Sequence, residues 1–318
     1  MHTRSRALRA AVLLAALAAF APGCEGCKGK TSGKTKVVCS IFPVYDLTRR
    51  VAGPDADAVL LLPPGQNEHE YTPTSKEIEQ VAMSQLGVMV GLGLDQWMSK
   101  VMSSAAPKAR TLELGTKVKT RTIDLEMTGD EAADKARDGG AHDEHEHEKG
   151  AIDPHVWLDP QRARTMVAAI ADDLAAVDPA HAEGYKARAK EVDADLAALD
   201  EEIAKRMAAL AKRGFITFHG SFGYFAERYN LRILAVIEPF PGSAPTGEYI
   251  QEVLSVVSKN GVPALFSEPQ LDARPAKTIA EAAKVPLGVL DPVGGGPDAK
   301  DYDAMLRFDA AALEKYMK

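Results

Sequence analysis

Residues 185–210 read YKARAKEVDADLAALDEEIAKRMAAL, and this stretch decides the fold. Apolar side chains recur in it every three or four residues, which is the spacing of one face of an α-helix. They are Tyr185, Ala189, Val192, Leu196, Leu199, Ile203, Met207 and Leu210. The pattern predicts a helix over residues 179–211 that, at about 1.5 Å per residue, is roughly 45 Å long. Because one small lobe does not need so long a helix, we expect it to join two lobes.

On both sides of this helix, short apolar runs alternate with longer amphipathic ones. The expected strands cover residues 37–41, 58–62, 87–92, 215–218, 231–236, 264–266 and 287–290. The expected helices cover residues 44–51, 75–83, 96–102, 162–177, 222–229, 247–260, 273–283 and 302–316. This alternation predicts an α/β fold of two lobes, residues 37–178 and 212–318, joined by one long rigid helix. Each lobe should hold a mostly parallel sheet flanked by helices. Ser75 ahead of Glu77 is typical of a capped helix start.

The first residues have the composition of a secretory signal. Three arginines precede an apolar run over residues 10–20, and small residues lead from it to Cys24. The run is shorter than the about 20 apolar residues that span a bilayer. We expect residues 1–23 to be a signal peptide and residues 24–36 a flexible tether. The protein then lies in the periplasm or at the outer face of a bacterial membrane. Lipidation of Cys24 would be its only membrane anchor, and simple cleavage and release is the alternative.

Charge and cysteine content narrow the classes of function. The 318-residue chain carries 38 Lys and Arg against 45 Asp and Glu, and loss of the signal arginines would bring its net charge from −7 to near −10. An acidic exported protein is a poor candidate for binding nucleic acid and is compatible with cations. Beyond Cys24, only Cys27 and Cys39 remain, so no disulfide framework holds the fold.

A charged segment over residues 129–150 has almost no large apolar side chains. Its composition predicts a disordered loop. The segment contains His142, His145 and His147 among acidic residues. We expect these histidines to collect metal ions at low affinity, on top of their role as part of a solvated loop.

Four further polar residues stand where expected strands end or in the connections between elements. His69 follows the strand that ends at residue 62, His155 lies in DPHVWLDP (residues 153–160), and His219 and Asp291 each follow a strand directly. In open α/β sheets, ligands bind beyond the carboxyl ends of the strands. Two facing lobes would therefore bring these side chains to one cleft.

Three imidazoles and one carboxylate suit a tetrahedral Zn²⁺ site, whereas Mn²⁺ prefers more oxygen ligands. Each residue also has a purely structural interpretation. A histidine at a strand end is usually a hydrogen-bonded loop residue, and His219 could cap the helix that follows it. Asp291 before a proline is a common turn residue. Spacing alone does not join the four positions.

A family resemblance does join them. The chain from residue 37 onward resembles the substrate-binding proteins of bacterial ABC importers for zinc and manganese. The segments that carry it are GQNEHEYTP (65–73), DPHVWLDP (153–160), FHGSFGYF (218–225) with Tyr229, FSEPQ (266–270) and LDP (290–292). The resemblance implies that His69, His155, His219 and Asp291 are the ligands, with Glu68 as a further candidate. Histidine at position 219 and the acidic, histidine-rich loop resemble zinc-type members rather than manganese-type ones.

The resemblance also implies partners and a role. A monomeric, extracytoplasmic Zn²⁺-binding protein would deliver the ion to an ABC permease with its ATPase, without catalysing a reaction. A manganese importer component or an adhesin of the same fold is the alternative. An exported zinc hydrolase would need an open coordination position and a general base, for which Glu68 is the only candidate beside the site. The sequence has no His-Glu-x-x-His helix motif of such enzymes.

Overall fold

The computed structural model describes residues 33–123, 151–239, 242 and 244–318. Contacts divide the chain into a unit Met1–Gly33 and a unit Lys34–Lys318, and the fold below is that of the second. The predicted signal peptide, Cys24, most of the tether and the loop histidines His142, His145 and His147 lie outside the described residues.

The first lobe contains a parallel four-stranded sheet in the order β2-β1-β3-β4. Its strands are β1 (Thr35–Cys39), β2 (Ala56–Leu60), β3 (Leu86–Met89) and β4 (Arg110–Glu113). Helices α2 (Ser75–Ala82) and α3 (Gln96–Ala105) cover one face of this sheet, and α1 (Phe42–Ala52) and α5 (Pro160–Val177) cover the other. Each face therefore buries its own apolar side chains, as expected for a parallel sheet.

The second lobe repeats this arrangement with the order β6-β5-β7-β8. Its strands are β5 (Gly214–Thr217), β6 (Arg232–Val236), β7 (Leu265–Ser267) and β8 (Leu287–Val289), and its helices are α7 (Gly223–Arg228), α8 (Gly247–Asn260), α9 (Arg274–Ala283) and α10 (Tyr302–Met317). In both sheets the strand order reverses beside the first strand, between β1 and β3 and between β5 and β7. Such switch points are where open α/β sheets bind ligands.

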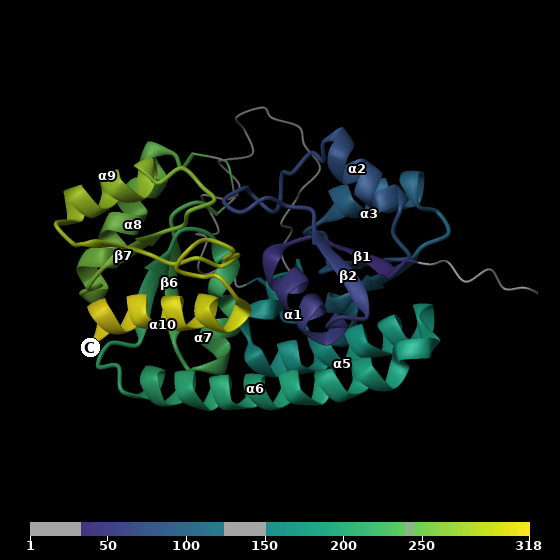
Figure 1. Cartoon of the computed structure of the whole chain (residues 1–318). Helices are drawn as coiled ribbons and strands as arrows, with labels where there is room; N and C mark the ends of the chain where they lie inside the picture. Colours follow the sequence, from purple (N-terminus) through teal and green to yellow (C-terminus); the bar gives the residue numbers. More distant parts are fainter. Residues whose placement is uncertain (1–32, 124–150, 240–241, 243) are drawn as a thin grey trace, which may run out of the picture. The chain divides into compact units, whose positions relative to one another are not determined.

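The predicted long helix is present. After a short 3₁₀ turn, Pro179–His181, helix α6 runs over Ala182–Ala208 and packs against α1 and α5 of the first lobe and α10 of the second (Figure 1). Its predicted apolar face is buried throughout, from Tyr185 to Met207. The predicted fold class, two α/β lobes with a long helix between them, is confirmed.

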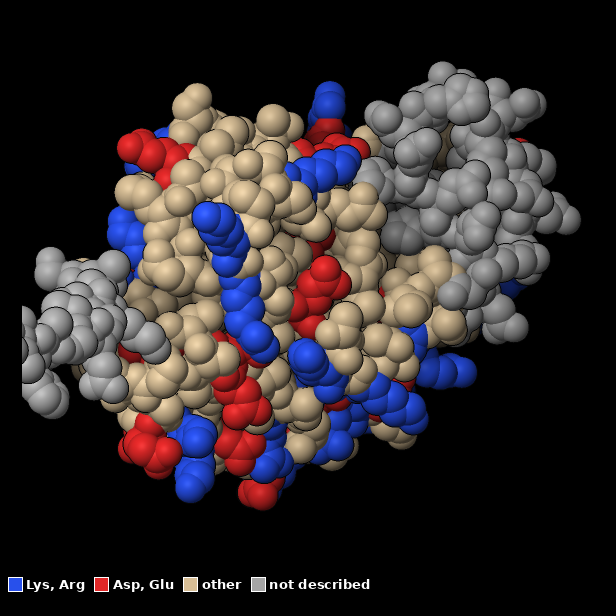
Figure 2. All heavy atoms as spheres, turned by 90° about the vertical axis from the view of Figure 1, so that its right-hand side faces the viewer, with Lys and Arg blue, Asp and Glu red and all other residues tan. Residues whose placement is uncertain are grey.

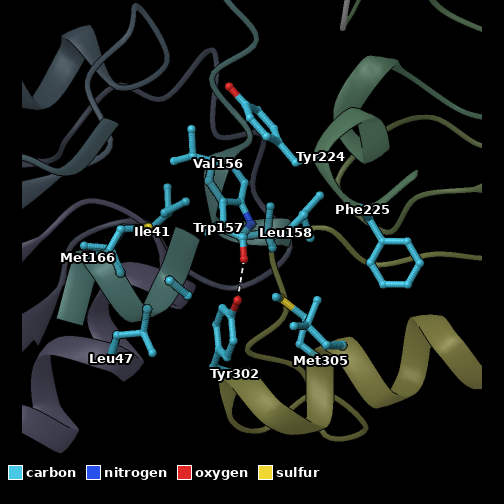
Figure 3. Close-up of a cluster of buried hydrophobic side chains, with 14 of the residues drawn as sticks. Ile41, Leu47, Val156, Trp157, Leu158, Met166, Tyr224, Phe225, Tyr302 and Met305 are labelled. Atoms are coloured by element: carbon cyan, nitrogen blue, oxygen red, sulfur yellow. Dashed lines mark hydrogen bonds between the residues drawn. The ribbon is translucent and has the colours of Figure 1, made fainter. Parts of the chain in front are cut away.

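One continuous apolar core extends through both lobes. Trp157, in the 3₁₀ turn Val156–Leu158 of the first lobe, is fully buried in it (Figure 3). The Trp157 indole donates a hydrogen bond of 2.7 Å to the carbonyl of Pro292, in the second lobe. The Tyr302 hydroxyl, on α10, donates to the Trp157 carbonyl at 2.5 Å. Burial of a residue this large, with both polar groups satisfied, fixes the two lobes against each other.

Basic and acidic side chains are interspersed on the face of the molecule drawn in Figure 2. Among the helices that the structure describes, none is both long and apolar enough to cross a membrane.

Several element bounds differ from the predictions, since β2 ends at Leu60 rather than at residue 62 and β3 ends at Met89 rather than at residue 92. Three further details also depart from them. Strand β1 begins at Thr35, inside the predicted tether. Strand β4 was not predicted, because only Leu112 of its four residues is buried and no alternation is visible. The cap of α2 is Thr74 rather than Ser75, since a capping box needs its two side chains three residues apart and Glu77 pairs with Thr74.

Candidate metal centre

His155 is held by the aspartate that stands two residues before it. Asp153 Oδ1 accepts a hydrogen bond from the His155 backbone N–H at 3.0 Å and lies 2.9 Å from the ring nitrogen Nδ1. Downstream, Asp159 caps the N-terminus of α5 and Pro160 occupies its first turn. The two Asp-Pro pairs thus fix the backbone on either side of His155. A carboxylate at Nδ1 favours the tautomer in which Nε2 can accept a metal ion.

His219 lies two residues beyond the end of β5 and is fixed in the same way. Its Nδ1 lies 2.6 Å from Oε2 of Glu268, which follows the neighbouring strand β7. The other oxygen, Oε1, faces the His219 backbone N–H at 3.4 Å and the Ser221 hydroxyl at 3.2 Å. Burial lowers the pKa of His219, but the carboxylates of Glu268 and Glu68 outweigh burial and raise that pKa to about 9.

His69 lies in the connection between β2 and α2. Its backbone N–H donates to the Asn67 side chain at 2.9 Å. The Trp97 indole donates to the carbonyl of the adjacent Glu68 at 3.2 Å and so ties this connection to α3. The packing of Tyr71 on Trp97, with ring centroids 5.0 Å apart, supports the connection further.

Three imidazoles and one carboxylate converge. One ligand atom from each of Glu68, His69, His155 and His219 lies within 4.8 Å of the others. The Nε2 atoms of His155 and His219 are 3.3 Å apart. Nitrogens bound tetrahedrally at 2.0–2.1 Å to Zn²⁺ lie about 3.4 Å from each other, so this pair has the separation that the ion requires.

Glu68 supplies an oxygen to this group. Its Oε1 lies 3.9 Å from Nε2 of His69 and 4.0 Å from Nε2 of His219. The atom is buried, and within the described part of the chain it has no hydrogen-bond partner. Burial raises the pKa of Glu68, although His219 and His155 oppose this shift. Burying a carboxylate oxygen that accepts no hydrogen bond costs free energy unless a cation pairs with it. The donor set therefore fits a divalent metal ion.

Asp291 stands outside this group of four. Its Oδ1 accepts hydrogen bonds from the Gln270 side chain at 2.7 Å and from the backbone N–H of Gly294 at 2.8 Å. Its own N–H donates to Asp309 of α10 at 2.7 Å. These contacts make Asp291 a turn residue here, and its predicted role as a ligand stays a prediction. The structure brings the three predicted histidines together with Glu68.

Cys39 contributes no ligand to the centre. Within the described residues it forms no disulfide; it is fully buried in strand β1, and burial raises the pKa of its thiol to about 12. A thiol of this kind stays protonated and behaves as a small apolar side chain.

Sequence reasoning missed the two orienting carboxylates, Asp153 and Glu268. A usable signal existed for both. Asp153 stands two residues before a predicted ligand, where its side chain can reach the ligand's own backbone N–H. Glu268 comes two residues after one expected strand and His219 comes directly after another, and neighbouring parallel strands bring such residues together.

The fold and this centre define a class of metal-binding protein with two α/β lobes. Residues 37–316 match the family described as zinc-uptake complex component A, periplasmic, and the chain belongs to that family. It is a family of periplasmic zinc-uptake components, not of enzymes.

Individual relatives agree with this assignment. The zinc-binding protein AdcA of Streptococcus pyogenes serotype M3 is 31% identical over 287 residues, which cover 88% of this chain and 56% of AdcA. The high-affinity zinc uptake system protein ZnuA of Brucella abortus is 29% identical, over 91% of this chain and 93% of its own. A crystal structure of ZnuA superposes with a TM-score of 0.77 at 23% identity, covering 90% of this chain and all of that one. The chain thus spans about half the length of the streptococcal relative.

Proposed function

We propose that this protein binds one Zn²⁺ ion with high affinity outside the cytoplasm and delivers it to an ABC permease. The observation that carries the proposal is the convergence of three histidines and Glu68, with two of the imidazoles oriented by carboxylates. Relatives named for zinc binding and zinc uptake support the choice of ion.

The donor set favours zinc over manganese. Three nitrogens and one oxygen suit a tetrahedral Zn²⁺, whereas Mn²⁺ prefers more oxygen ligands. With four protein ligands no coordination position is left for a reactive water, in contrast to catalytic zinc sites. This argues for a carrier of the ion rather than a zinc hydrolase.

Two carboxylates compete for the fourth position. The sequence predicts Asp291, and the unsatisfied Oε1 of Glu68 favours Glu68. We propose that Glu68 completes the set with His69, His155 and His219. Asp291 lies outside the converging group and would join it only if its side chain moved toward the three histidines.

Delivery requires partners. We propose a membrane permease with its ATPase, reached by a monomer that a lipid on Cys24 keeps near the membrane. The acidic, histidine-rich loop over 129–150 would gather ions for the central site through His142, His145 and His147.

The test is metal analysis with competitive chelator titration of the purified protein. One molar equivalent of tightly held Zn²⁺ is expected, and His219→Ala should abolish it. Glu68→Gln should weaken zinc binding far more than Asp291→Asn, and the reverse ranking would return the fourth position to Asp291. An unaltered affinity in His219→Ala would overturn the assignment of the site.

A further inference from the structure

The two carboxylate oxygens of Asp153 have different partners. Its Oδ1 holds His155, through both the backbone N–H and the ring. Its Oδ2 accepts a hydrogen bond of 2.8 Å from Nη1 of Arg121. Asp153 is only 1% exposed, so the direction of its carboxylate depends on these partners rather than on water.

Arg121 is itself held by the opposite lobe. Its Nε lies 3.3 Å from Oε2 of Glu227 on α7. Its backbone N–H donates to the Tyr224 hydroxyl at 3.0 Å, and that hydroxyl donates to the Asp153 carbonyl at 2.7 Å. Arg121 and Asp153 belong to the first lobe, and Tyr224 and Glu227 belong to the second. The network therefore crosses between the lobes.

The side chains of Arg121 and Asp153 pack against a glycine of the second lobe. Gly223, the first residue of α7, lies four residues after His219. A methyl group placed on Gly223 would overlap both Nη1 of Arg121 and Oδ2 of Asp153. The arginine–aspartate pair thus packs directly on the backbone of the turn that follows His219. The same methyl group on Gly220, in the preceding 3₁₀ turn, would meet nothing within 4 Å.

We infer that Arg121 is a positioning residue for the metal centre, which acts through Asp153 to hold His155 in its ligating orientation against the second lobe. The inference rests on the proposed zinc binding. The planar guanidinium can face Asp153 and Glu227 at once through different nitrogens, whereas a lysine offers a single point of contact. Removal of a partner that orients a metal-ligating histidine typically lowers metal affinity by about 10- to 100-fold.

The test uses variants that keep the net charge, because removal of a cation would itself strengthen cation binding. Arg121→Lys retains the positive charge but loses the planar guanidinium with its several nitrogens. Gly223→Ala displaces the Arg121–Asp153 pair without removing either side chain. Each should weaken zinc affinity by about tenfold. Their matched controls are Arg307→Lys, at an arginine of α10 paired with Glu202 of α6, and Gly220→Ala. Both controls should bind zinc like the unmodified protein.

A double-mutant cycle separates positioning from general stability. In an Asp153→Asn background, Arg121→Lys should cause little further loss of affinity, because the residue through which it acts has already changed. A full tenfold loss in that background, or a lower melting temperature of the metal-free protein with unchanged zinc affinity, would overturn the inference.

If Gly223→Ala does not fold, Arg121→Lys alone decides between these results. If the unmodified protein binds no zinc, the proposed function fails and this inference fails with it. Stoichiometric zinc binding with an unaffected Arg121→Lys would refute the inference alone.

Discussion

Oε2 of Glu268 lies 2.6 Å from Nδ1 of His219, although 49 residues separate the two in sequence. The parallel pairing of β5 with β7 produces this contact. Because the carboxylate both orients the ring and increases its basicity, Glu268→Ala should weaken zinc binding by about 10- to 100-fold. Chelator competition measures the change. Glu281→Ala, an exposed glutamate of α9, is the control that should leave affinity unchanged.

Zinc binding should release a proton near neutral pH. With a pKa of about 9, His219 is protonated in the metal-free protein at pH 7, and the ion can bind Nε2 only after that proton has left. Zinc affinity should therefore rise with pH until the pH passes about 9. Calorimetry in two buffers of different ionisation enthalpy measures the released proton. A binding enthalpy that is the same in both buffers would contradict the prediction.

Zinc should stabilise the fold against heat. A ligand that binds only the folded state adds about 2.7 kcal/mol when its concentration is 100 times its dissociation constant. The melting temperature should rise with zinc in the unmodified protein and stay constant in His219→Ala. An equal rise in both proteins would indicate binding elsewhere in the chain.

Trp157→Phe should destabilise the protein by about 1–3 kcal/mol, because the buried carbonyl of Pro292 loses its donor. Denaturant unfolding of the metal-free protein measures the change. Tyr302→Phe removes the neighbouring hydrogen bond to the Trp157 carbonyl and should have a similar effect. A negligible cost in both variants would show that the contact between the lobes does not depend on these bonds.

Deletion of residues 129–150 should leave the tight zinc site intact. The four side chains that converge, Glu68, His69, His155 and His219, lie outside that segment. Titration should show that only weaker binding is lost. A deletion variant without tight binding would mean that the histidine-rich segment belongs to the central site.

Periodicity was sufficient to predict the long helix and most strands. In α6, every residue of the predicted apolar face from Tyr185 to Met207 is buried, because a helix that packs along one side repeats its contacts every three to four residues. Strand β4 offers no such repeat, since Leu112 is its single buried residue. A strand of this kind takes its place from pairing with β3, which its own residues do not encode.

Part of the candidate metal site could also be predicted from the sequence. A strand-end rule and a family resemblance together indicated His69, His155 and His219, and the three rings converge. The choice between Glu68 and Asp291 depends on side-chain directions in two loops. The orienting role of Glu268 depends on which strands are neighbours. Neither property follows from spacing along the chain.

The core shared by the two lobes affects both the entropy cost of zinc binding and the rate at which zinc exchanges. Trp157 fixes the segment of His155 against the second lobe, and Asp153 and Glu268 hold the rings of His155 and His219. Folding rather than zinc has therefore already restricted the rotation of these two imidazoles. Little of the binding free energy is then lost to ordering the protein, which is the advantage of a preorganised host. We expect the rate of ion exchange to depend on the breaking of individual coordination bonds, not on a large swing of one lobe away from the other.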